Sequence, residues 1–127
     1  MSDIATGMES VPWLSLGDFN VVRYNTEKVR GDQSWPNYMD ELNECCRNAG
    51  IDDLRNVGHL TTWSKGSGRG FKARKLDRVL VNYPWLSCFP EAEACFAEPS
   101  VSDHSPVIVN LGIQYHIRRP PFRFFSY

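Results

Sequence analysis

Long apolar runs and a leader-like N-terminus are both missing from this sequence. No window reaches the roughly eighteen consecutive apolar residues of a membrane-spanning helix. The opening residues, MSDIATGMES, lack the basic start and apolar centre of a secretory signal. We therefore expect a protein of the nucleus or the cytoplasm that does not enter a membrane.

Cysteine pairs with metal-binding or redox spacing are also missing. The sequence has no CxxC pair and no His/Cys cluster with the spacing of a zinc site. Cys45 and Cys46 are adjacent within a predicted helix, and Cys88 and Cys95 lie far from them in the chain. We expect all four cysteines to be reduced packing residues.

Charge is nearly balanced over the whole chain but is unevenly distributed. Residues 1–64 carry five Lys/Arg against ten Asp/Glu, and residues 65–127 carry nine against five, which together give the net charge of −1. Six of the basic residues fall within 65–78, KGSGRGFKARKLDR. This asymmetry favours a polyanionic partner, although a solvated surface loop would give the same composition.

The pattern of apolar residues predicts one α/β (α+β layered) domain with one main helix and one mixed or antiparallel sheet. We expect a flexible tail at 1–11, a domain over 12–113 and an extended Pro/Arg/aromatic tail at 114–127. The predicted strands are WLSLGDF, IDDL (or a turn), HLTTW, KLDRVLVN, EAEACFAE and a segment from Val107, with one helical turn at YPWLSCF. KLDRVLVN has apolar residues on both faces, as a buried strand does.

The helix is predicted at 35–49. Ser34 is a plausible N-cap, Pro36 sits in the first turn and Gly50 ends the helix. A single apolar stripe runs along it through Trp35, Met39, Leu42, Cys46 and Ala49. We interpret this stripe as a core face.

Polar side chains follow three of the predicted strand boundaries. Asp18 and Asn20 can cap a turn, Asp77 can pair locally with Arg78, and the SDH triplet before Pro106 can form an Asx turn. Taken together they also supply carboxylates and an imidazole, the groups that metal-assisted phosphodiester hydrolysis uses. A glycine-rich basic loop beside such a site could contact a nucleic-acid backbone.

The motifs GDFN, LDRVLVN and SDHSPV, in this order, resemble the three C-terminal motifs of the DNase I-like endonuclease/exonuclease/phosphatase superfamily. The segments PWLSLGDFNVV, GIDDL, TTWSKG and PPFRFF are more similar to the endonuclease domain of LINE-type (non-LTR) retrotransposon polyproteins, of the kind abundant in plants. The resemblance covers residues 12–125 and implies the C-terminal half of a four-layer sandwich and a nuclease ancestry.

The resemblance implies a role for each matching residue. Asp18 would activate the attacking water or serve the leaving group, and Asn20 would orient the nucleophile and the phosphate. His104 would contact the scissile phosphate as general acid or base, and Asp77 would accept a hydrogen bond from it. Asp103 would belong to a Mg²⁺ or Mn²⁺ site. The residues expected to contact DNA are Lys65, Arg69 and Lys72.

The family's first half, with its metal-binding glutamate, has no counterpart here, because only 17 residues precede Asp18. We therefore expect weak metal binding and a sheet face, including Leu14, Leu16, Val79 and Val107, that lacks its cover. Self-association or a partner protein would cover that face. Two functions follow: a remnant of a Mg²⁺-dependent endonuclease that is inactive alone, or a nucleic-acid- or protein-binding module derived from it. The sequence PPFRFFSY ends abruptly, and a truncated gene model is a third interpretation of the chain.

Overall fold

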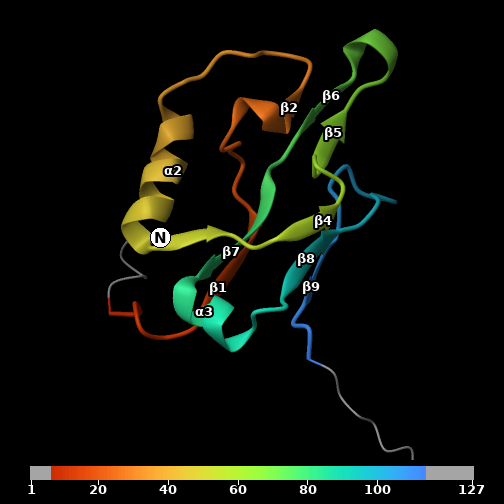
Figure 1. Ribbon diagram of the computed structural model, residues 1–127. Helices are drawn as coiled ribbons and strands as arrows, with labels where there is room; N and C mark the ends of the chain where they lie inside the picture. The colour runs from red at the N-terminus through yellow and green to blue at the C-terminus, as the bar shows by residue number, and fades with distance from the viewer. Residues whose placement is uncertain (1–6, 114–127) are drawn as a thin grey trace, which may run out of the picture.

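The computed structural model describes residues 7–113. These residues form an α+β fold with three small sheets and two α-helices (Figure 1). The helices are α2 (Tyr38–Ala49) and α3 (Tyr83–Cys88). The strands are β1 (Leu14–Asp18), β2 (Lys28–Val29), β3 (Ile51–Asp53), β4 (Asn56–Gly58), β5 (Trp63–Lys65), β6 (Lys72–Arg74), β7 (Asp77–Asn82), β8 (Glu93–Phe96) and β9 (Val107–Asn110). Short 3-10 turns occur at Asn25–Glu27 and Gly68–Gly70.

The prediction of one sheet is wrong. The strand orders are β1-β7-β3, β2-β6-β5 and β4-β8-β9, and every pair is antiparallel except β4 with β8. The reason lies at Leu54 and Arg55, which separate β3 from β4. β3 pairs with β7, whereas the next strand, β4, pairs with β8 in another sheet. One short stretch of chain therefore serves two sheets, which a periodicity pattern cannot reveal.

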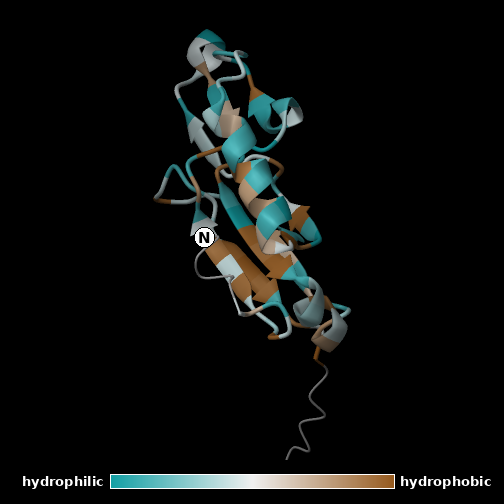
Figure 2. Cartoon of the chain, turned by 90° about the vertical axis from the view of Figure 1, so that its left-hand side faces the viewer, coloured by the Kyte–Doolittle hydropathy of each residue, from teal (hydrophilic) through white to brown (hydrophobic). Residues whose placement is uncertain are grey.

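β7 forms the centre of the molecule, as its apolar pattern predicted. Val79 and Val81 share one core cluster with Ala94 and Phe96, whereas Leu80 points the opposite way, toward Cys46 of α2. The helix and the β4-β8-β9 sheet thus lie on opposite faces of β1-β7-β3, with β7 buried between them (Figure 1). Apolar colour gathers in these central strands and polar colour at the end that carries the β5–β6 hairpin (Figure 2).

α2 starts three residues later than predicted, at Tyr38, with Asn37 at the N-cap position. Ser34 is not the cap, because it lies three residues before Asn37; its hydroxyl and its amide both donate to the Asp32 carboxylate. Gly50 ends the helix in the left-handed region at φ 64°, as expected. Within residues 7–113, neither helix is long and apolar enough to span a membrane.

The sheet face expected to be bare is largely covered. Val79 is buried, and Leu14 and Val107 pack half-buried against the same cluster. Only Leu16, at 52% exposure, matches the expectation. The cover comes from the chain itself, because the β4-β8-β9 sheet packs on the face that Val79 and Val81 present.

Three of the other predicted elements are confirmed and one is wrong. The helical turn at α3, the strand β8 within EAEACFAE and the strand from Val107 are confirmed. The strand predicted at HLTTW is wrong, because residues 59–62 link β4 to β5 without strand structure.

All four cysteines are free, and burial raises the pKa of the Cys46 thiol, which keeps it in its unreactive form.

A network of charged side chains is buried between α2 and the sheet. The fully buried Arg78 guanidinium donates to Glu27 Oε2 and, at 3.1 Å, to both carboxylate oxygens of Asp53. Arg23 Nη1 donates at 2.7 Å to Asp52 and Asp53. The buried charges of this network, Arg23, Glu27 and Arg78, therefore each have an opposite partner, which is the condition for tolerating them in the interior.

Candidate functional site

Two carboxylates of the candidate site meet through strand register. β1 and β7 pair antiparallel so that Asp18 lies directly opposite Asp77. The bond from Phe19 N to Leu76 O marks the neighbouring pair as the hydrogen-bonded one, so Asp18 and Asp77 form a close, non-hydrogen-bonded pair. Two like charges in this position repel, and a cation between them relieves that repulsion.

The imidazole of His104, which is a cation when protonated, lies between the Asp77 and Asp18 carboxylates. Its Nδ1 lies 2.8 Å from Asp77 Oδ2, and its Nε2 lies 3.9 Å from Asp18 Oδ2. Because a carboxylate can only accept, Nδ1 carries the proton in the bond to Asp77, which leaves Nε2 as the nitrogen that faces Asp18. The imidazole is 32% exposed, so a ligand in solvent can reach it.

The surrounding carboxylates change the protonation of His104. The hydrogen bond to Asp77 raises the pKa of the imidazole above 6.5, against a smaller opposing effect of burial. The charges of Asp77, Asp18 and Asp103 raise this pKa further. The imidazole therefore holds its proton more readily than a free histidine does, and its exposed nitrogen can exchange a proton with a ligand, as an acid–base group must.

Asp18 caps a turn and faces the imidazole at the same time. Its Oδ1 accepts a 2.7 Å hydrogen bond from the backbone of Asn20, while its Oδ2 faces His104. Asn20 takes a left-handed conformation at φ 56°, which asparagine tolerates better than most residues. The turn-capping alternative for GDFN is thus correct for the backbone, and it leaves the second carboxylate oxygen free for the site.

The local ion pair considered for Asp77 is not formed. Successive residues of a strand point to opposite faces, so Asp77 turns to His104 while Arg78 turns to Glu27 and Asp53. The Asx turn considered for SDH is also replaced, because it is the Ser102 hydroxyl that accepts from His104 N. The Asp103 side chain instead accepts a 2.9 Å hydrogen bond from Trp63 Nε1.

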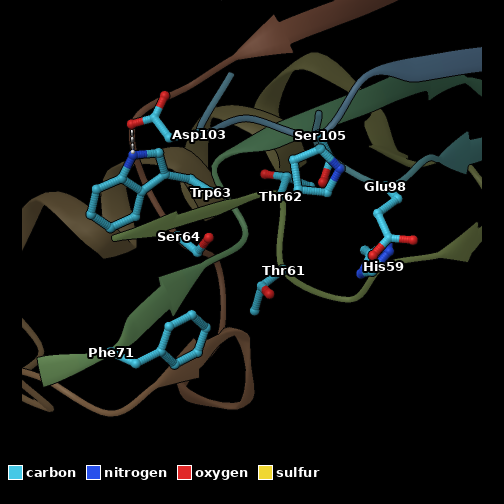
Figure 3. Close-up of a pocket in the computed structure, with 10 residues that line it drawn as sticks. His59, Thr61, Thr62, Trp63, Ser64, Phe71, Glu98, Asp103 and Ser105 are labelled. Carbon is cyan, nitrogen blue, oxygen red and sulfur yellow. Dashed lines mark hydrogen bonds between the residues drawn. The ribbon is translucent and has the colours of Figure 1, made fainter. Parts of the chain in front are cut away.

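Asp103 faces a neighbouring cavity of about 190 Å³ (Figure 3). Its lining includes His59, Thr61, Thr62, Trp63, Ser64, Phe71, Glu98, Pro99 and Ser105. The indole of Trp63 stands beside the Asp103 carboxylate at one end, and Glu98 and His59 lie at the other (Figure 3). Trp63 therefore joins the cavity to the segment that carries His104.

The residues present do not fit a Mg²⁺ or Mn²⁺ ion. Within residues 7–113, no three His, Cys, Asp or Glu side chains gather so that they could hold a metal ion. Asp103 also has one oxygen bound to the Trp63 indole. A hard divalent cation requires several oxygen ligands, so further ligands would have to come from outside this group.

The three residues predicted to contact DNA lie together on the β5–β6 hairpin. Lys65, Arg69 and Lys72 are all exposed, and Lys65 pairs directly with Lys72 across the two strands. Arg69 lies in the turn between them, and Arg30 Nη1 donates at 3.0 Å to Gly68 O of the same turn. This end of the hairpin therefore presents concentrated positive charge.

Thr62 and Trp63 contact the site, but residue types alone did not single them out. Trp63 forms an isolated antiparallel bridge with His104, and Ser64 N donates to Asp103 O. A partial indication of these two residues was present in the sequence, because TTW lies between the GDFN and LDRVLVN motifs. A buried threonine in an apparent strand nonetheless gives no hint of which backbone groups its hydroxyl will meet.

No protein-family model matches this chain, and neither a curated protein nor a solved structure does so. The candidate site therefore stands on its own geometry.

Proposed function

We propose that this chain is a remnant of a divalent-metal-dependent phosphodiesterase of the LINE endonuclease type that does not cleave DNA by itself. The observation that carries the proposal is the row Asp77–His104–Asp18, in which a carboxylate orients an imidazole toward a second carboxylate. Hydrolysis of a phosphodiester needs a group that transfers a proton and one that positions water, and these residues can do both.

The chemistry of the row is limited to proton transfer and phosphate contact. Protonated His104 can donate from Nε2 to a phosphate oxygen, while Asp77 holds Nδ1–H and fixes the ring. Asp18 Oδ2, close to Nε2, can accept a proton from water. A hard divalent ion would neutralise charge on the phosphate, and among the described residues no three His, Cys, Asp or Glu side chains gather to hold one.

The first test is nicking of supercoiled plasmid by the purified chain with Mg²⁺, beside a His104→Ala control and circular dichroism of both proteins. We expect no nicking above the control, because the metal ligands are incomplete. Nicking that disappears in His104→Ala would contradict the inactivity and show that the chain completes a working site.

The second test asks whether the site still recognises a phosphodiester. The dinucleotide dTpdT is titrated into isotope-labelled protein, and the ring signals of His104 are followed by NMR. We expect saturable shifts at His104 that are weaker in Asp77→Asn, since a neutral amide no longer stabilises the protonated ring that donates to the phosphate. Unchanged His104 ring signals at high dTpdT concentration in folded protein would contradict the proposed phosphodiesterase ancestry of this site.

The alternative function, nucleic-acid binding without cleavage, is favoured by the hairpin. Lys65 and Lys72 face each other directly, and like charges so placed are unfavourable unless an anion lies between them. Trp63 and Arg74 lie on the same hairpin face, two residues along each strand, so an aromatic ring adjoins the charge. The hairpin thus suits a phosphate backbone.

This alternative is tested with fluorescence anisotropy of labelled duplex DNA over a range of salt. Replacing Lys65, Arg69 and Lys72 together by Gln should lower the salt slope of log K by about 3 if each contacts one phosphate. Arg47→Gln, an exposed charge on α2, is the matched control and should leave the slope unchanged. Equal slopes in all three proteins would exclude the hairpin.

A further inference from the structure

A buried threonine lies where the two halves of the candidate site meet. Thr62 is 1% exposed and precedes β5, while Asp77 begins β7 and His104 lies before β9. Its hydroxyl and its carbonyl each accept hydrogen bonds from a different segment of the chain. Thr62 is thus hydrogen-bonded to the backbone of both segments that deliver the Asp77–His104 pair.

The hydroxyl acts on the Asp77 side. Thr62 Oγ1 accepts from Leu76 N at 3.0 Å and from Asp77 N at 2.9 Å. Asp77 N has no strand partner on the β3 side, because β3 pairs with β7 only from Leu80 onward. Leu76 N, which precedes β7, donates to this hydroxyl and not to β1. A buried amide without an acceptor is costly, so the hydroxyl takes the place of the missing strand.

The carbonyl acts on the His104 side. Thr62 O accepts from Ser105 N at 2.7 Å, next to the histidine, and Ser105 is itself buried. Thr62 N donates to Arg74 O at 2.9 Å, which ties the residue to β6 as well. The separation between the start of β7 and the His104 segment is therefore set through one residue.

We propose that Thr62 is a positioning residue that fixes Asp77 relative to His104 through its hydroxyl and its carbonyl. This role rests on the proposed function, since it matters to chemistry only if the pair acts on a phosphodiester. The effect on the pair itself can be measured without any activity. Failure of the nicking or dTpdT experiments and failure of this inference are therefore distinguishable.

The test compares Thr62→Val, which keeps the shape and removes the acceptor, with Thr62→Ser, which keeps the acceptor. The readout is the proton on His104 Nδ1, observed by NMR through its resonance and its rate of exchange with solvent. We expect Thr62→Val to exchange this proton at least several-fold faster than the wild type, because Asp77 is no longer held. Thr62→Ser should restore the wild-type rate.

Thermal unfolding of the same proteins separates positioning from stability alone. A lower Tm in Thr62→Val with wild-type exchange at His104 would overturn the proposal and leave Thr62 a packing residue. Equal exchange in the Val and Ser variants would overturn it as well.

The unmodified protein provides a measurement that holds even if Thr62→Val does not fold. The Leu76 and Asp77 amides should be protected from hydrogen exchange, as their bonds to Thr62 Oγ1 require. Exchange of both amides at the rate of exposed backbone would contradict the proposal.

Discussion

Asp77 and Arg78 are neighbours on β7, but they belong to two charged regions of opposite character. Arg78 is fully buried and its guanidinium is bound to Glu27 and Asp53. Asp77 has 13% of its side chain exposed and holds His104, which is 32% exposed and whose second nitrogen faces Asp18 across 3.9 Å. The first region has its charges paired within the core, while the second leaves an imidazole nitrogen and a carboxylate oxygen accessible.

The difference shows how to separate structural charge from chemical charge. Buried ion pairs perturb pKa values too, as at Arg23, where burial opposes the charge but the pairs with Asp52 and Asp53 raise the pKa. A perturbed pKa alone therefore does not mark a site. What distinguishes His104 is a raised pKa together with access for a ligand.

The largest expected effect comes from breaking the buried region. Arg78→Met should reduce the free energy of unfolding by about 3–5 kcal/mol, because Glu27 would remain charged without its partner in the core. Asp77→Asn, one residue away, changes a carboxylate that is 13% exposed to an amide that can still accept from His104, and should cost only about 1 kcal/mol. Urea unfolding of the two variants measures both, and similar losses would erase the contrast between the regions.

A smaller effect sharpens the same comparison. Glu27→Gln and Arg78→Met in one protein should be less destabilising than the sum of the single changes, by about 0.5–3 kcal/mol, since the two side chains share one interaction. The matched pair Glu93→Gln and Arg55→Gln removes an exposed salt bridge, 3.4 Å long, and should be additive. Additive losses at Glu27 and Arg78 would show that their contact contributes little.

The smallest effect is the pH dependence from His104. A histidine with a raised folded pKa adds stability that is complete below its unfolded value of 6.5 and is lost as pH rises through the folded value. The Tm should therefore fall between about pH 6 and pH 9 more in wild type than in Asp77→Asn, where a neutral amide replaces the carboxylate that stabilises the charged ring. Calorimetry at both pH values tests this, and an equal fall in both proteins would contradict it.

Local patterns predicted much of the fold. β7, β8, β9, α3 and the C-terminal end of α2 follow from apolar alternation, capping residues and a C-terminal glycine. The three sheets did not follow, because the switch of partners at Leu54 depends on the distant strands β7 and β8. The start of α2 was missed because Ser34 belongs to a turn with Asp32 and lies three residues before the N-cap position at Asn37.

The candidate site was predictable in its residue types and less so in its connections. Asp18, Asp77 and His104 were named from their places at strand boundaries, and the structure brings these three together. Asp103 comes close in sequence, but its carboxylate binds Trp63, and no set of metal ligands forms around it within residues 7–113. Thr62 was missed because its role depends on backbone amides that only the folded chain leaves without strand partners.

The most direct test of the contrast between Asp77 and Arg78 is an NMR titration of the His104 ring in three proteins. The wild type should titrate above 6.5, Asp77→Asn should titrate lower than the wild type, and Glu27→Gln, which removes a carboxylate from the buried network, should match the wild type. Equal values in the wild type and Asp77→Asn would contradict the assignment of Asp77 to His104. A shift in Glu27→Gln as large as that in Asp77→Asn would show that the two regions are not separate.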